Sequence, residues 1–401
     1  MKDRPVVRVL FIAPLPPPIT GHSLAAQVLL DDLSRSQPVD VVNLSVGSGN
    51  DGTISATRVL EVCRLLAAVW RKKRRADVIY LTIAESLAGN CKDLVIYLLC
   101  GAQLSRFVIH LHGGSIKRLL FDRYPVVRWL NALAVRRMAG AIVSGPSHEE
   151  IFATMIDRSR IHVVPNFAKD ELFVTEAAID EKFARAQSVR VLYLSGMAEA
   201  KGYVDLVDAY LGLSPATRAH IHLDFAGRFD SVEERATFLR RVNGVHGIRY
   251  HGVVGDAAKQ KLFAESHVFC LPTRMAEGQP ISILEAYASG CVVVTTGQAG
   301  IRDIFADGRN GFEIEPASPR SITDVLERLH AMGTALQPIA RRNRAEAVAR
   351  YRTSRFNQDV RAILGAAYAS NVAPIHWPSG ASVVTQDDGP PRSPRNASPP
   401  A

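Results

Sequence analysis

The chain has 401 residues, of which 47% are hydrophobic and 22% charged, and its formal net charge is +9 at pH 7. This length and balance fit a globular protein of two domains and exclude a low-complexity chain. The sequence also lacks the ~18 uninterrupted apolar residues that a membrane-spanning helix needs. Its five cysteines are widely spaced without a metal-binding or C-x-x-C pattern, so we expect buried thiols in a reducing compartment.

Short apolar segments alternate with helix-length segments through residues 1–165. The apolar segments are rich in Val and Ile and end in turn-forming residues, which predicts β-strands. They are "VRVLFIAP", "VDVVNLSV", "ADVIYLTI", "RFVIHLHG", "GAIVSGPS" and "IHVVPN". Strands that alternate with helices in this way indicate a parallel sheet covered on both faces, so residues 1–165 are predicted to form a doubly wound domain.

The same alternation starts again at Val189 and predicts a second doubly wound domain over residues 189–345. Its predicted strands are "VRVLYLSG", "IHLDFAGR", "GIRYHGVV", "HVFCLPT" and "CVVVTTG". Residues 166–188 are polar and are interpreted as a linker with helical pieces. Ligands of such sheets bind at the carboxyl ends of the strands, so we expect the site in a central cleft that the two domains face.

The end of the chain is predicted to leave the second domain. Residues 346–369 are helical in pattern, and we expect them to pack back on the first domain. Residues 370–401 are dominated by proline, glycine, serine and polar residues, which predicts a disordered tail.

The positive charge is concentrated in the first 165 residues, which hold 21 Lys and Arg against 13 Asp and Glu. The run "RKKRRA" at residues 71–76 is the densest part, and its plainest interpretation is a solvated helix end. An anionic membrane surface and a nucleic acid are the functional alternatives. Leu65, Leu66, Val69 and Trp70 precede the run, which favours an interfacial helix. No nucleic-acid motif accompanies them, so no nucleic-acid partner is expected.

The segment "MAEGQPISILEAYASG" follows a predicted strand and holds two acids, Glu277 and Glu285. Pro280 is typical of a helix start, because its missing N–H would have no partner there, and Gly290 is typical of a helix stop. The first amides of the helix then point outward and favour a phosphate. Glu285 would lie one turn inside, where a carboxylate can accept the hydroxyls of a ribose. Taken singly, each acid would be better explained by a solvent-exposed position; the combination of their spacing with Gly278 and Pro280 favours a ligand site.

With these features together, "EGQPISILEAYASGCVVVTT" resembles the E-x7-E segment of retaining glycosyltransferases of the GT-B fold, family 4. The resemblance extends over roughly Val6 to Leu364. It includes the N-terminal glycine loop, the histidine strand, the interdomain segment, the phosphate-binding loop and the closing strand-loop segment. These are "PPPITGHSLAAQVLLDDL", "VIHLHGGS", "VVPNFAKDELF", "LSGMAEAKGYVDLVDAY" and "GIRDIFADGRNGFEIEP".

The resemblance implies a UDP- or GDP-sugar donor that is bound mostly by the second domain, without a divalent metal or another cofactor. Glu285 would hold the ribose and Glu277 the hydroxyls of the donor sugar. Lys201 would neutralise the diphosphate as the nucleotide leaves, which suits a metal-free site because fixed cations must then stabilise that charge. The remaining residues implied by the matched motifs line the phosphates and the sugar: Gly196, Gly278, Gln279, Pro280 and Ile281.

One position departs from the family pattern. The family usually has an arginine shortly before the lysine, where this chain has Met197. A methionine cannot stabilise a phosphate. Arg228 follows the next predicted strand, and we hypothesise that it supplies the missing charge.

The first domain contributes a predicted catalytic histidine, His112, which the family places against the donor sugar. His110 alternates to the other side of the strand and is predicted to pack in the core. A buried structural role is the alternative for His112, but Gly113 follows it and favours an open contact loop. Gly21 could let backbone approach the diphosphate or the acceptor; for His22, contact with an acceptor and a plain position in a strand-to-helix turn are equally good interpretations.

We therefore predict a retaining glycosyltransferase with Lys201, Glu277 and His112 as its catalytic residues. Its acceptor would be a saccharide or a polyprenyl-linked glycan in polysaccharide biosynthesis. The basic first domain favours a cytoplasmic protein held peripherally on the inner face of the membrane. The alternatives are a sugar-nucleotide epimerase of similar fold, which would need acid and base residues at the sugar, and a non-catalytic partner subunit, which Met197 makes conceivable.

Overall fold

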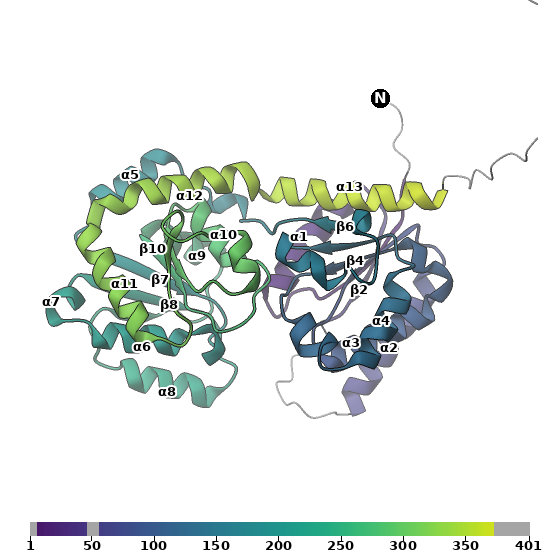
Figure 1. Cartoon of the computed structure of the whole chain (residues 1–401), viewed down its shortest axis with the longest axis horizontal. Helices are drawn as coiled ribbons and strands as arrows, with labels where there is room; N and C mark the ends of the chain where they lie inside the picture. The colour runs from purple at the N-terminus through teal and green to yellow at the C-terminus, as the bar shows by residue number, and fades with distance from the viewer. Residues whose placement is uncertain (1–5, 46–55, 373–401) are drawn as a thin grey trace, which may run out of the picture.

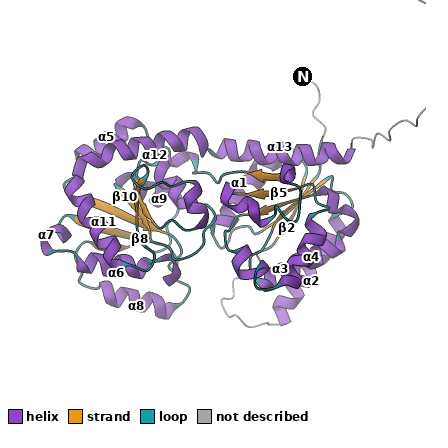
Figure 2. Cartoon of the chain, viewed as in Figure 1, coloured by secondary structure: helices purple, strands orange, loops and turns teal. Residues whose placement is uncertain are grey.

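The computed structural model describes residues 6–45 and 56–372. Each of its two domains is a β-sheet between layers of helices (Figures 1 and 2). Every strand pairing given for the described residues is parallel, as the alternating pattern predicted. Most of the predicted tail, residues 373–401, lies outside the described residues.

The N-terminal sheet has the strand order β2-β1-β3-β4-β5-β6, and each predicted segment of the first half contains one of these strands. The strands are β1 (Val9–Ala13), β2 (Val39–Asn43), β3 (Val78–Thr82), β4 (Phe107–Leu111), β5 (Gly140–Val143) and β6 (Ile161–Val163). The helices are α1 (Gly21–Ser34), α2 (Ala56–Lys72), α3 (Leu87–Leu99) and α4 (Pro125–Val135), with the short η1 (Gly101–Arg106), η2 (Lys117–Phe121), η3 (Pro146–Ile151) and η4 (Arg158–Arg160).

The C-terminal sheet has the order β12-β11-β10-β7-β8-β9. Its strands are β7 (Val189–Leu194), β8 (Ile221–Ala226), β9 (Ile248–Tyr250), β10 (Val268–Leu271), β11 (Val292–Thr295) and β12 (Gly311–Glu313). The α-helices of the second half are α5 (Glu176–Ala184), α6 (Tyr203–Gly212), α7 (Pro215–Arg218), α8 (Val232–Val242), α9 (Asp256–Glu265), α10 (Ile281–Ala288), α11 (Pro319–Met332), α12 (Gln337–Arg350) and α13 (Thr353–Val372). Short helices are η5 (Asp170–Leu172), η6 (Glu199–Lys201), η7 (Ala299–Asp303) and η8 (Gly333–Leu336).

The segment predicted as a linker is largely part of the C-terminal domain. Ile179 and Phe183 of α5 are buried in the same apolar cluster as strands β7, β10 and β11. Lys182 lies between them in sequence, and its Nζ donates to the backbone oxygens of Ser266 at 2.9 Å and Ser289 at 2.8 Å. The polar composition concealed this because two apolar residues four positions apart suffice to bury one face of a short helix.

The end of the chain crosses back to the N-terminal domain, later than the sequence predicted. Residues 346–350 still belong to α12 on the C-terminal domain, and α13 begins only at Thr353. Helix α13 lies along the N-terminal domain (Figure 1), where Phe356 and Val360 share an apolar cluster with β1 and β3. The crossing runs beside the first one, because the Ala168 amide donates to the Tyr351 carbonyl at 2.8 Å.

The basic run after α2 is partly engaged within the protein. The Lys72 ammonium donates to the Val41 carbonyl at 2.8 Å, and Lys73 bonds the Leu99 carbonyl beneath the ring of Trp70. Leu65 and Val69, which favoured an interfacial helix, are instead core residues, whereas Trp70 stays exposed. Within the described residues, no helix combines the length and apolar character that crossing a bilayer requires.

Candidate active site between the two domains

Lys201 and Glu277 lie together where β7 and β10 end. Lys201 ends η6, and its ammonium is 2.5 Å from Oε1 of Glu277, which also accepts a hydrogen bond from the Thr273 hydroxyl at 2.8 Å. Gly202 follows with φ of 81°, and a Cβ there would lie 2.0 Å from the Pro272 carbonyl. Lys201 and Glu277 are thus brought together by a close approach of the backbone at Gly202 to that at Pro272, which only glycine permits.

The loop that carries Glu277 is held by a contact that no sequence pattern predicts. The Arg274 guanidinium binds both carboxylate oxygens of Asp205, at 3.0 and 2.6 Å. Asp205 is a buried residue of the first turn of α6. A bidentate pair of this kind sets both distance and orientation, so it holds the loop against the helix that follows Lys201.

Helix α10 begins one residue later than predicted, with Pro280 as its N-cap. The Ile283 amide bonds the Pro280 carbonyl at 3.1 Å. Among the described residues, the amides of Ile281 and Ser282 donate to no protein acceptor. The free amides of Ile281 and Ser282 therefore point out of this helix start, and Gly290 ends the helix with φ of 62°. The helix start keeps the property that favours an anion.

Glu285 lies on α10 and is buried, but it is not an unpaired carboxylate. Its Oε1 accepts from the Lys259 ammonium at 2.6 Å. Burial raises the pKa of Glu285, although the nearby Lys259 charge opposes the shift. Lys259 comes from α9, in a stretch whose sequence has no distinguishing spacing, so it was missed.

Gln279 and Gly278 join the domains instead of lining open space. The side-chain oxygen of Gln279 accepts from the Asn166 amide at 3.1 Å, and its backbone oxygen accepts from Asn166 Nδ2 at 2.8 Å. A Cβ on Gly278 would lie 2.0 Å from the His112 carbonyl. Gln279 therefore has a structural role between the domains in addition to the role predicted for it at the sugar.

Three histidines form a column at the domain interface. The rings of His110 and His112 stack at 3.9 Å between centroids, and His22 follows at 5.6 Å from His112. The Tyr80 hydroxyl holds Nδ1 of His110 at 2.7 Å, so His110 is a core residue as predicted. Both ring nitrogens of His112 are buried without a partner among the described residues. Buried polar atoms of this kind are costly unless something binds them, which makes His112 available to a ligand.

His22 faces the Lys201–Glu277 pair from the opposite domain. Burial lowers the pKa of His22, the positive charge of Lys201 lowers it further, and Glu277 opposes the shift. The side chain nevertheless keeps solvent contact. Burial also holds the pKa of His112 well below its usual value, with His110 and His22 adding to the shift. His112 is therefore neutral at physiological pH and can either donate or accept a hydrogen bond.

Two predicted glycines face open space. A Cβ on Gly21, the first residue of α1, or on Gly196, after β7, would meet no protein atom within 4 Å. Packing within the protein therefore does not require a glycine at either position. Both positions leave room for a ligand to approach the backbone.

Met197 and Arg228 lie next to each other in the C-terminal domain. Met197 is a buried core residue, and its amide donates to the Arg228 carbonyl at 2.9 Å. The Arg228 side chain is exposed on a hollow of about 380 Å³ and has no hydrogen bond or ion pair within the described part of the chain. The arginine is thus free to bind an anion, while the methionine packs inward.

Several contacts between the domains were not predicted. The Ser147 hydroxyl donates to Asp303 at 2.6 Å, and the Ser115 hydroxyl donates to the Ala276 carbonyl at 2.9 Å. The amides of Ser115 and Ile116 donate to Oε1 of Glu85 at 2.6 and 2.8 Å, and burial raises the pKa of this carboxyl. The Ser115 hydroxyl thus braces the loop after His112 against the loop of Glu277, while Glu85 holds the same loop within the N-terminal domain.

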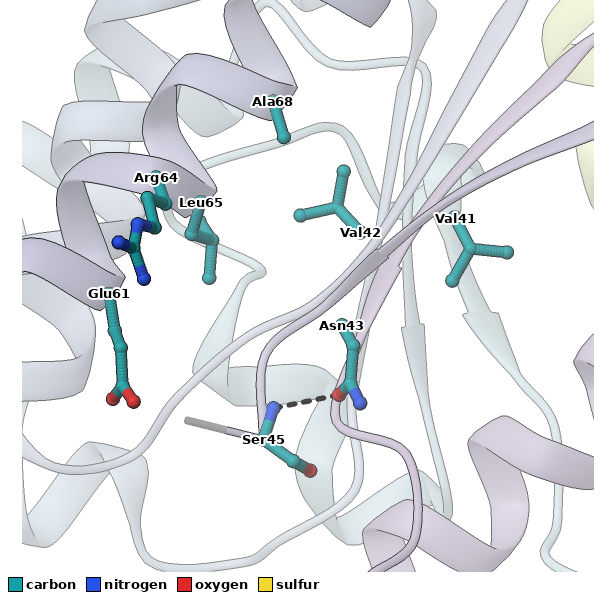
Figure 3. A pocket seen from close by; sticks show the side chains of 8 residues that line it. All are labelled: Val41, Val42, Asn43, Ser45, Glu61, Arg64, Leu65 and Ala68. Atoms are coloured by element: carbon teal, nitrogen blue, oxygen red, sulfur yellow. Dashed lines mark hydrogen bonds between the residues drawn. The ribbon is translucent and has the colours of Figure 1, made fainter. Parts of the chain in front are cut away.

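A second hollow, of about 370 Å³, lies at the carboxyl end of β2. Figure 3 shows side chains of α2 on one side and residues of β2 and the following turn on the other. Its lining comprises Val41, Val42, Asn43, Ser45, Glu61, Arg64, Leu65 and Ala68. None of the predicted site residues lines it, and residues 46–55, which follow Ser45, lie outside the described residues.

Across residues 6–45 and 56–372, His, Cys, Asp and Glu side chains form no group of three that could hold a metal ion. The charges that meet at the domain interface are instead Lys201, Glu277 and the start of α10. Two parallel Rossmann-like sheets that meet at such a site are the arrangement of the GT-B fold.

Comparison with known proteins relates the C-terminal domain to a known family. The family model described as glycosyl transferases group 1 matches residues 188–332, which form most of the C-terminal domain. The C-terminal domain is thus similar to the glycosyl transferases group 1 family, as the E-x7-E segment predicted.

Two curated relatives are phosphatidyl-myo-inositol mannosyltransferases. The Mycobacterium leprae protein is 25% identical over 242 residues, which cover 55% of this chain and 63% of that protein. The Mycobacterium tuberculosis H37Rv protein is 26% identical over 231 residues, which cover 53% and 60%. The chain thus spans less than two thirds of the length of the curated relatives that it matches.

Solved structures share the whole fold. Anabaena Alr3699/HepE in complex with UDP and glucose has a TM-score of 0.67 at 18% identity, over 89% of this chain and 99% of that one. Sucrose-phosphate synthase from Thermosynechococcus elongatus has a TM-score of 0.69 at 13% identity, over 91% and 100%. The predicted GT-B fold is therefore confirmed.

Proposed function

We propose that the chain is a retaining, metal-independent hexosyltransferase. It would move a sugar from a UDP- or GDP-sugar to a saccharide or polyprenyl-linked glycan during polysaccharide biosynthesis. The observation that carries the proposal is the Lys201–Glu277 pair at 2.5 Å, which lies opposite the unpartnered nitrogens of His112. The family match and the nucleotide-bound structure of similar fold support a nucleotide-sugar donor.

The diphosphate would lie between Lys201 and the start of α10. Departure of the nucleotide concentrates negative charge on the phosphate oxygens, which Lys201 and the amides of Ile281 and Ser282 would stabilise without a metal. Arg228 would add a second cation in place of the family arginine, because its guanidinium has no other partner among the described residues.

The donor sugar would lie between Glu277 and His112. Glu277 would accept sugar hydroxyls through the carboxylate oxygen that Lys201 and Thr273 leave free. Neutral His112 would hydrogen-bond the sugar from the other domain. The bond from the anomeric carbon to the phosphate oxygen breaks as the acceptor oxygen bonds the same face, and the departing phosphate takes the acceptor proton. The protein contributes orientation and charge stabilisation.

The ribose would bind at Glu285. Oε1 of Glu285 is engaged by Lys259, and its other oxygen has no protein partner among the described residues. The Lys259 charge opposes the burial that raises the pKa of this carboxyl, and the ion pair orients the group toward the ribose hydroxyls. Lys259 is thus a positioning residue for the nucleotide.

A lipid-linked acceptor fits the remaining features. The curated relatives are named for a phosphatidyl-myo-inositol acceptor, and the N-terminal domain carries the surplus of positive charge. We infer a cytoplasmic protein that associates peripherally with the inner face of the membrane.

The test begins with thermal shifts in the presence of UDP, GDP, ADP and their sugars. One nucleotide should raise the melting temperature of the wild type and of Lys261→Gln, an exposed lysine on α9, but much less that of Lys201→Gln. Products made with that donor and candidate glycans are then examined by NMR, where retention of the anomeric configuration is expected. An inverted product refutes the retaining mechanism, and an altered sugar nucleotide formed without acceptor favours an epimerase.

A further inference from the structure

The outer side of α4 carries an uncovered apolar stripe. Leu119 of η2 and Val126, Trp129 and Leu130 of α4, together called the α4 face, expose 47%, 69%, 59% and 38% of their surfaces. The α4 residues, with Leu133, repeat at the three- and four-residue spacing of one helix side. The inward side of α4 is buried separately through Asn131, Ala134 and Val135. The exposed stripe is therefore surplus to the core of this domain.

Basic side chains surround the α4 face. Residues 117–137 contain six Lys and Arg but a single acid, Asp122. Lys117 pairs with Asp122 at 2.8 Å, while Arg118, Arg123 and Arg136 are exposed. The α4 face therefore combines apolar residues, one of them tryptophan, with exposed basic residues beside them. This combination complements a partner whose interior is apolar and whose boundary is negatively charged.

The α4 face also lies close to the candidate active site along the chain. Ser115 and Ile116, the braced residues of the loop after His112, directly precede η2, and η2 packs against α4. A surface that binds the α4 face therefore lies beside the N-terminal wall of the site. We propose that η2 and α4 dock this protein on an anionic lipid bilayer, so that a lipid-linked acceptor reaches the site from the membrane plane; the acceptor part rests on the proposed function.

The α4 face is a better candidate than the basic run of α2 that the sequence emphasised. On α2, Leu65 and Val69 are buried and Lys72 and Lys73 bond backbone carbonyls. The apolar exposure near that run is then mainly Trp70. On α4, by contrast, three exposed apolar residues lie within two helical turns.

The experiment is sedimentation of the full chain with vesicles of phosphatidylglycerol and phosphatidylcholine, compared with phosphatidylcholine alone. We expect binding only to the anionic vesicles, weakened by salt. Val126→Ser/Trp129→Ser should lose most binding. Arg118→Gln/Arg123→Gln should lose roughly 30-fold in affinity, since each basic residue near such a surface contributes a factor of roughly five. Val6→Ser, an equally exposed apolar change away from α4, should bind as the wild type does.

Each variant is also tested for its melting temperature and its nucleotide-induced thermal shift, so that misfolding or a wrong donor assignment is recognised separately. Equal binding to neutral vesicles overturns the proposal, as does wild-type binding by Val126→Ser/Trp129→Ser. Loss of binding in Trp70→Ser alone would assign docking to α2 and overturn it too. If the chain binds no vesicles, and the Trp129 substitution converts an oligomer to monomers, then the α4 face is a protein contact and the proposal is wrong.

Discussion

Replacing Lys201 with glutamine removes a cation whose ammonium lies 2.5 Å from Glu277, with side chains that are 23% and 13% exposed. Before ligand binds, the loss of this partly exposed pair should cost about 1 kcal/mol of stability. On catalysis the effect should be larger. At ~4 Å and an effective dielectric constant of ~20, a unit charge interacts with a phosphate charge by about 4 kcal/mol. Removal of one group that stabilises developing charge typically lowers kcat by ~10²–10³.

The assay measures kcat and KM for the donor by release of the nucleotide. We expect Lys201→Gln to lower kcat by about 100-fold or more with a smaller change in KM, because the charge on the leaving diphosphate increases only as the bond breaks. Lys201→Arg should recover part of kcat. Lys261→Gln, on the exposed side of α9, is the matched control and should match the wild type.

A structural role for the pair makes a different prediction, which the double variant tests. If Lys201→Gln were harmful only because it leaves Glu277 unpaired, then adding Glu277→Gln would restore activity. If both residues contact the donor, the double variant stays at least as slow as either single one. A kcat of Lys201→Gln within threefold of the wild type would refute the assignment outright.

Three further predictions concern other residues. Gly114→Ala places a Cβ 2.1 Å from the Glu277 carbonyl, so the domains should separate. X-ray scattering should then show a larger radius of gyration, and kcat should fall. In the control Gly101→Ala, the added Cβ meets nothing within 4 Å, and neither quantity should change. Arg228→Ala should raise the donor KM about tenfold, while the exposed Arg249→Ala should not; equal values would end its role as the replacement cation. Burial lowers the pKa of His267 from 6.5 to about 4, so protonation of this histidine opposes folding. The free energy of unfolding should therefore fall by about 3 kcal/mol as the pH drops from 6.5 to 4, and His267→Gln should flatten this slope in thermal melts.

The sheets and the main residues of the C-terminal site were predictable because their signals are local. The strand of β10 and the start of α10 lie within one continuous segment, so chain connectivity alone brings Glu277 and Glu285 to the same end of the sheet. The lysine that pairs with Glu277 follows β7, which is the neighbour of β10 in the sheet. A parallel sheet places the carboxyl ends of neighbouring strands together, so their meeting followed from the fold class.

The contacts between the domains could not be predicted in this way, because no periodicity links the residues involved. The resemblance implies that Gly278 lines the sugar, and Gly113 and Gly114 are expected to open a contact loop. In the folded chain a Cβ on Gly278 would lie 2.0 Å from the His112 carbonyl, and one on Gly114 would lie 2.1 Å from the Glu277 carbonyl. These glycines let the two backbones touch, and that contact places His112 against the loop of Glu277. Each of these glycines is required because a backbone oxygen of the other domain lies against it. Its role could therefore be recognised only in the folded structure.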